Sequence, residues 1–160
     1  MHEDYKYLLF CSMASHEATE FSSQLSSESG EAHIERKREL TALGWRAFDN
    51  SEQLGIESRH GYFGVAYYKP SGDDNEFEIV FAHRGTCFNK PGNILADIAI
   101  ARRENPEILQ DAFSYIKKIF IGIDFYNNTS PLTSLTQLQN RMILKVTNVT
   151  HTGFSLGGFI

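Results

Sequence analysis

The apolar residues in the first part of the chain recur at helical spacing. From Asp4 to Leu25 they return mostly in steps of three, four or seven, which predicts an amphipathic helix. Residues 26–30, SSESG, are predicted to break this helix. Residues 31–43 are highly charged and favour a second helix with a solvated face.

Strand-like patterns come next. Residues 45–48 and 62–68 are rich in aromatic side chains and are predicted to be strands. The turn-forming sequence KPSGDDN at 69–75 closes the second of them and predicts a hairpin. Residues 77–82, FEIVFA, form a nearly continuous apolar run, which is typical of a strand buried on both faces of a sheet.

Helical spacing then returns and alternates with one more strand. Helices are predicted at 93–103, from Asn105 to about Ile121 with a proline in the first turn, and at 132–144. Residues 146–151 are rich in β-branched side chains and predict a strand. Strands that alternate with helices predict an α/β fold with a mostly parallel sheet and flanking helices.

The clearest chemical motif lies at residues 153–157, GFSLG, which has the pattern Gly-x-Ser-x-Gly. This pattern places a serine on a sharp turn between a strand and a helix. Gly153 and Gly157 flank Ser155 because the close packing of that strand against that helix leaves no space for side chains there. Backbone N–H groups at the start of the helix, beginning with Leu156, are expected to face the serine and stabilise an oxyanion.

Composition and charge narrow the class of protein. With 41% hydrophobic and 22% charged residues the 160-residue chain resembles one ordinary globular domain. Its formal net charge of -5 and the lack of a long basic stretch argue against nucleic acid as a partner. Cys11 and Cys87 form neither a disulfide framework nor a metal knuckle, and no metal or cofactor is expected. A cytoplasmic protein is expected by default, since no clear signal peptide is present, with export by another route and the oligomeric state left open.

Three segments together carry a resemblance to a known family. They are IVFAHRGT at 79–86, GNILADI at 92–98 and TGFSLGG at 152–158. The combination resembles the class 3 lipases, the fungal-lipase-like branch of the α/β-hydrolases, over about residues 45–160. The resemblance implies a partial α/β-hydrolase domain over 45–160, preceded by a helical lead-in over 1–44.

The resemblance also implies roles for individual residues. Ser155 matches the nucleophile, and Thr86, with the backbone of Leu156, matches the oxyanion hole. Asp97 matches an acidic position after the oxyanion loop, where a structural role such as pairing with Arg84 is expected.

Two positions depart from the family pattern, and both lie in its motifs. The family usually has phenylalanine where this chain has His83, and histidine where it has Phe154. His83 is predicted to be a structural histidine with satisfied hydrogen bonds rather than a functional one. His151 lies four residues before Ser155, and we do not expect it to be the base because the strand carries it away from the serine.

In this fold the acid and histidine of the triad follow the serine in sequence, whereas only residues 156–160 follow Ser155 here. We therefore expect the chain to be the N-terminal part of a longer protein, truncated after the nucleophile strand. The function expected of the whole is that of a serine ester hydrolase of lipase type. Its substrates would be acylglycerols, phospholipids or other carboxylic esters of lipid metabolism, met in transient contact with a lipid surface.

Two alternatives remain open from the sequence. One is a different acyl hydrolase or an acyltransferase on the same scaffold, because fold and triad do not fix the substrate. The other is a non-catalytic remnant or binding module that keeps the sheet and hydrolyses nothing.

Purified residues 1–160 are expected to hydrolyse p-nitrophenyl butyrate no faster than buffer does, because a serine without a neighbouring base is a poor nucleophile. The release of p-nitrophenol measures this directly. A burst of product that disappears in Ser155→Ala would contradict the expectation.

Overall fold

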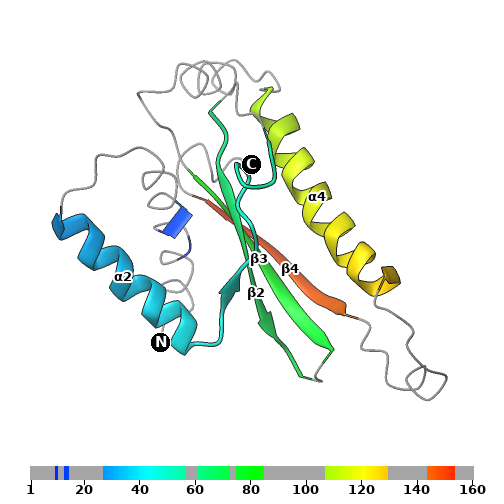
Figure 1. The fold of residues 1–160 in the computed structure, drawn as a ribbon, viewed down its shortest axis with the longest axis horizontal. Helices are drawn as coiled ribbons and strands as arrows, with labels where there is room; N and C mark the ends of the chain where they lie inside the picture. Colours follow the sequence, from blue (N-terminus) through cyan, green and yellow to red (C-terminus); the bar gives the residue numbers. More distant parts are fainter. Residues whose placement is uncertain are drawn as a thin grey trace.

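Four strands form one sheet, in the order in which they occur along the chain. The structure is a computed structural model that describes residues 10, 13–14, 27–56, 61–72, 75–84, 107–129 and 144–153. The strands are β1 (Arg46–Ala47), β2 (Gly64–Pro70), β3 (Glu76–His83) and β4 (Lys145–Gly153). The helices are α2 (Ser27–Ala42) and α4 (Ile108–Thr129). Figure 1 shows α2 and α4 on opposite sides of the sheet.

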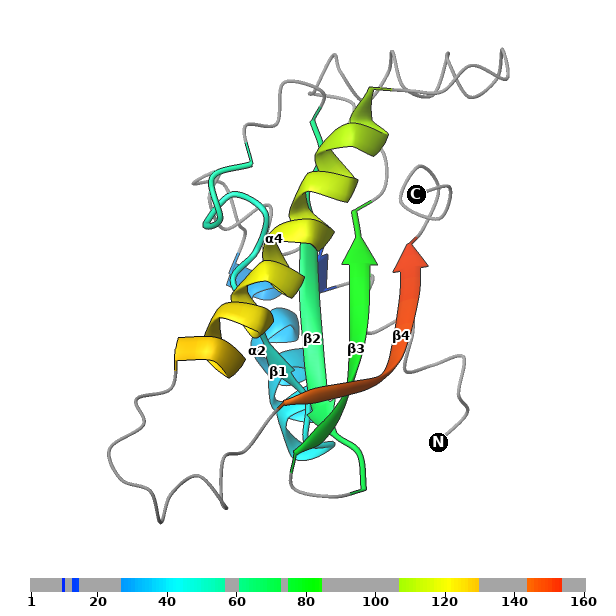
Figure 2. The same ribbon diagram turned by 90° about the vertical axis from the view of Figure 1, so that its right-hand side faces the viewer.

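The sheet is mixed, which confirms the α/β class. β1 pairs with β2 and β2 with β3 in antiparallel orientation, whereas β3 and β4 are parallel. Figure 2 shows the arrowheads of β3 and β4 at the same end of the sheet. The described strands do not show the mostly parallel sheet expected from the sequence, because the turn after Pro70 joins β2 directly to its neighbour, and a short turn permits only antiparallel pairing.

Both faces of β3 are buried, as the continuous apolar run predicted. Ile79 and Phe81 point to the side of α4 and belong to its core cluster. Val80 and Ala82 alternate with them and pack on the other side, with Leu40 of α2. Period-two alternation therefore places an apolar residue on a helix-covered face at each position from Ile79 to Ala82.

α4 covers one face of the sheet with a single apolar stripe. Its buried residues recur every three or four positions: Ile108, Ala112, Tyr115, Ile119 and Ile123. The helix runs to Thr129, past the end predicted near Ile121, because Ile123 continues the buried stripe.

α2 begins at Ser27, so the break predicted at 26–30 is wrong for most of that segment. Serine is a favourable residue at helix N-termini, which the breaker interpretation overlooked. The charged face is exposed as predicted. Leu40 packs with Phe10, Met13 and Trp45 against the sheet. The helix predicted at 93–103 lies outside the described residues, as does all but the last residue of the helix predicted at 132–144.

Tyr115 of α4 occupies the position in the sheet where β1 ends. Its hydroxyl accepts a hydrogen bond from the Ala66 N–H at 2.8 Å and donates one to the Asp49 carbonyl at 2.9 Å. The side chain thus replaces a hydrogen bond that a longer β1 would have made to β2. It anchors α4 to the sheet through polar as well as apolar contacts.

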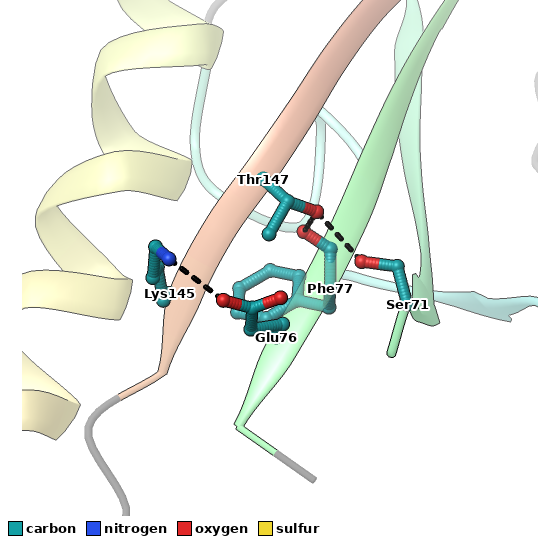
Figure 3. A network of polar contacts seen from close by, with 5 residues as sticks. All are labelled: Ser71, Glu76, Phe77, Lys145 and Thr147. Carbon is teal, nitrogen blue, oxygen red and sulfur yellow. Dashed lines mark hydrogen bonds and ion pairs between the residues drawn. The ribbon is translucent and has the colours of Figure 1, made fainter. Parts of the chain in front are cut away.

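An extra residue in β4 changes the register of the parallel pair. Val146 lies opposite Phe77, but Asn148 lies opposite the next residue of β3, so Thr147 is the extra residue of a bulge. The Thr147 hydroxyl donates to the Phe77 carbonyl at 3.2 Å and contacts the Ser71 hydroxyl at 2.6 Å (Figure 3). These bonds satisfy backbone and side-chain groups where the regular ladder is interrupted.

An ion pair holds the start of β4 next to this bulge. The Lys145 ammonium lies 2.7 Å from the Glu76 carboxylate (Figure 3). The backbone N–H of Lys145 donates to the Asn75 carbonyl at 2.8 Å. The pair is largely exposed, so its own contribution to stability is small. The network therefore sets register more than it adds stability.

Tyr115→Phe is expected to lower the free energy of unfolding by about 1–3 kcal/mol, because the buried Ala66 N–H loses its acceptor. Urea denaturation of the full chain measures this. The matched control is Phe113→Ala on the same helix, where the ring is 68% exposed and the cost should be within about 0.5 kcal/mol. Equal effects of the two substitutions would contradict the proposed anchor.

Candidate functional site

The two strand ends that precede the sequence motifs are neighbours. His83, the last residue of β3, lies opposite Gly153, the last residue of β4. Because the strands are parallel, the chain leaves both of them at the same end of the sheet, where their carboxyl ends lie. Arg84 and Gly153 are the predicted site residues that the structure describes, and Ser155, Leu156, Gly157, Thr86 and Asp97 lie outside the described residues.

Arg84 links the end of β3 to the segment before β2 through hydrogen bonds. Its N–H donates to the Phe63 carbonyl at 2.9 Å, and its guanidinium donates to the Gly61 carbonyl at 2.6 Å. The guanidinium also lies over the Phe63 ring, 5.6 Å from the centroid. These contacts support a structural role for Arg84, while the suggested pairing with Asp97 stays a prediction.

His83 and His151 form a hydrogen-bonded pair at the ends of the parallel strands, with their rings edge to edge. The two rings are nearly parallel, with an interplanar angle of 3°, and their centroids are 5.4 Å apart. His83 Nε2 lies 3.1 Å from His151 Nδ1. On its other side the His151 ring stacks on Phe81 with centroids 5.2 Å apart. The pair joins β3 to β4 through side chains, in addition to the backbone ladder.

Tyr62 extends this pair into the core. Its hydroxyl lies 3.1 Å from His83 Nδ1, so both ring nitrogens of His83 have partners. The approach depends on Gly64, where a Cβ atom would collide with the Tyr62 hydroxyl. His83 is only 1% exposed, which confirms the prediction of a structural histidine with satisfied hydrogen bonds. Tyr62, His83 and His151 are called the polar relay below.

Loss of hydration favours the neutral form of every member of the polar relay, including the more exposed His151. Loss of hydration lowers the pKa of His83 to about 3, and the neighbouring His151 adds to the shift. Loss of hydration also lowers the pKa of His151. The pKa of Tyr62 is raised well above its usual range, first by burial and then by Tyr115 and Asp111.

Sequence reasoning found only part of the polar relay. Tyr62 was predicted to be one of several aromatic residues of a strand, and no sequence signal distinguished it. For His151 the sequence predicted only that it is not the catalytic base. The bulge at Thr147, which brings His151 opposite Phe81, has no turn or glycine signal in the sequence. The histidine at position 83, where class 3 lipases usually have phenylalanine, was the one sequence signal that pointed to this cluster.

The described residues contain neither a group of three side chains suited to hold a metal ion nor a helix long and apolar enough to cross a membrane. Compared with known proteins, the chain matches no protein-family model, no curated protein and no solved structure.

The free energy of unfolding is expected to fall as the pH falls from 6.5 toward 3. In that range the unfolded chain binds a proton at His83, whose ordinary pKa is 6.5, while the folded chain with a pKa of about 3 does not. His151, with its lowered pKa, acts in the same direction. Above pH 6.5 this contribution is complete and constant.

The variant His83→Phe isolates this effect. At neutral pH it should lose about 1–3 kcal/mol, because the Tyr62 hydroxyl loses its partner. Its stability should then decline less steeply with acid than that of the original chain, as measured by urea denaturation at several pH values. Parallel curves for the two proteins would show that His83 does not titrate as the structure implies.

Proposed function

We propose that this protein is a serine ester hydrolase of lipase type, built on an α/β-hydrolase scaffold. The observation that carries the proposal is the register of the parallel pair, in which His83 lies opposite Gly153. The segment that resembles an oxyanion loop follows the first residue, and the nucleophile motif follows the second. In parallel sheets, ligands bind outside the carboxyl ends of the strands, where these two segments begin.

Chain length limits how far the two motif residues can lie from this edge. Ser155 is two residues beyond Gly153, and Thr86 is three residues beyond His83. Each residue spans at most about 3.6 Å, and neighbouring strands are about 4.8 Å apart. Both residues are therefore within about 11 Å of adjacent strand ends, which supports a shared site.

The proposed chemistry is acyl transfer to the serine. The Ser155 hydroxyl oxygen attacks the acyl carbon of an ester, and the backbone N–H groups of Thr86 and Leu156 stabilise the oxyanion. The serine proton passes to a histidine base, which then protonates the departing alcohol, and water releases the acid in a second step. His83 is unsuited to be that base because it is buried and both of its ring nitrogens are hydrogen-bonded.

The resemblance to class 3 lipases supplies the substrate class. Acylglycerols, phospholipids and other carboxylic esters share the acyl carbon that Ser155 would attack. The mixed sheet, with an antiparallel lead-in and a parallel pair whose connection contains α4, is compatible with this scaffold.

The test is labelling of the protein, expressed from its complete gene, with a fluorophosphonate probe that reacts with activated serines. Ser155 should be labelled in the native protein, as located by peptide mass mapping, and labelling should be lost on denaturation and in Ser155→Ala. Ser71→Ala should label normally, since Ser71 bonds to Thr147 at the opposite end of β4.

Absence of labelling in the native protein, or labelling at another serine, would contradict the proposal. The first result would favour a non-catalytic binding module on the same sheet.

A further inference from the structure

The polar relay has a definite direction of hydrogen bonding. Within the described part of the chain, the Tyr62 hydroxyl has His83 Nδ1 as its one hydrogen-bond partner. A buried hydroxyl proton without an acceptor costs about 1–3 kcal/mol, so the Tyr62 O–H donates to His83 Nδ1. Neutral His83 then carries its own proton on Nε2.

This direction fixes the state of His151. The His83 Nε2–H donates across 3.1 Å to His151 Nδ1, which must be the acceptor. Neutral His151 consequently carries its proton on Nε2. In this state neither nitrogen of His151 can accept the proton of a serine, so its role differs from that of a base.

Proton uptake by His151 breaks the relay. The added proton goes to Nδ1, where it faces the His83 Nε2–H, and two N–H groups cannot bond to each other. Transfer of the His83 proton to Nδ1 would reverse both bonds, but it would leave the buried Tyr62 hydroxyl proton without an acceptor, at a cost of about 1–3 kcal/mol. His151 is exposed to solvent whereas His83 is buried, so His151 is the entry point for the proton.

We propose that Tyr62, His83 and His151 are positioning residues that hold the ends of β3 and β4 together at neutral pH and release them when His151 takes up a proton. The consequence for Ser155 rests on the proposed function: the elbow and the oxyanion loop would lose their fixed separation in acid. Misplacement of about 1 Å between reacting groups can slow a reaction about 100-fold.

Few described charged or titratable groups surround the relay. α4 contributes Tyr115, whose ring centroid is 6.2 Å from that of Tyr62, and Asp111, whose charge acts on Tyr62. β3 continues into Arg84, whose guanidinium is turned to the Gly61 carbonyl. Across β2 the register partner of His83 is Gly64, which has no side chain. His151 is therefore the group on the relay best placed to respond to acid.

Hydrogen exchange of the backbone amides at 81–83 and 151–153 tests the coupling in the full chain without any need for catalysis. Between about pH 7.5 and about pH 4.5, on either side of the histidine range, protection corrected for intrinsic rates should fall about fivefold or more. That is the change expected when one hydrogen bond of typical net strength is lost.

Two substitutions at one position separate hydrogen bonding from titration. In His151→Asn the amide oxygen can accept from His83 Nε2–H and does not titrate, so protection at 81–83 and 151–153 should fall with acid no more than the lower overall stability requires, as measured on the amides of β2. In His151→Leu no acceptor is left, so protection should be low at both. His33→Asn, which changes a histidine of α2, should behave like the original chain.

Protection that does not depend on pH in the original chain, or His151→Asn and His151→Leu that behave alike, would overturn the inference. The rate of fluorophosphonate labelling at Ser155, measured on the same variants, should follow the exchange data. Exchange that behaves as expected without any labelling would refute the proposed function and leave the coupling established.

Discussion

The single extra residue in β4, Thr147, determines which side chains meet at the end of the parallel strand pair. Side chains alternate between the two faces of a strand, so a shift of one residue moves each of them to the opposite face. With the bulge, His151 lies opposite Phe81 and Gly153 opposite His83. Without it, threonines 150 and 152 would take these positions, and the two histidines would lie on opposite faces of the sheet.

The polar relay is an unusual group to bury, and its arrangement explains why it is tolerated. A buried polar group is costly unless it is hydrogen-bonded, and here each buried nitrogen and the tyrosine hydroxyl has a partner. The surrounding rings of Phe81 and Tyr115 make the site apolar, which holds both histidines neutral. A phenylalanine at position 83 would need no hydrogen bonds itself, but it would leave the buried Tyr62 hydroxyl without its partner. The relay thus adds a fixed, hydrogen-bonded link between two strand ends at the cost of sensitivity to acid.

The sequence predicted the elements better than their assembly. A continuous apolar run identified β3, β-branched residues identified β4, and apolar spacing identified the helix α4, although the predicted start at Asn105 lies outside the described residues. Local patterns could not predict the bulge, since Thr147 contributes to it through bonds to Ser71 and Phe77, which are distant in sequence. For the same reason the pairing of His83 with His151 was invisible: it depends on strand register, which no single segment encodes. Arg84 and Gly153 are the predicted site residues that the structure describes. They lie at the carboxyl ends of β3 and β4.

The central claim is that the parallel strand ends bring the nucleophile and the oxyanion donors to one site. A crystal structure of the complete gene product after phosphonylation tests it most directly, because the phosphonyl oxygen occupies the place of the oxyanion. The account predicts a covalent bond to the Ser155 hydroxyl oxygen, with the phosphonyl oxygen about 2.7–3.1 Å from the backbone nitrogens of Thr86 and Leu156. A phosphonyl oxygen bound by other groups, with Thr86 far from it, would contradict the account.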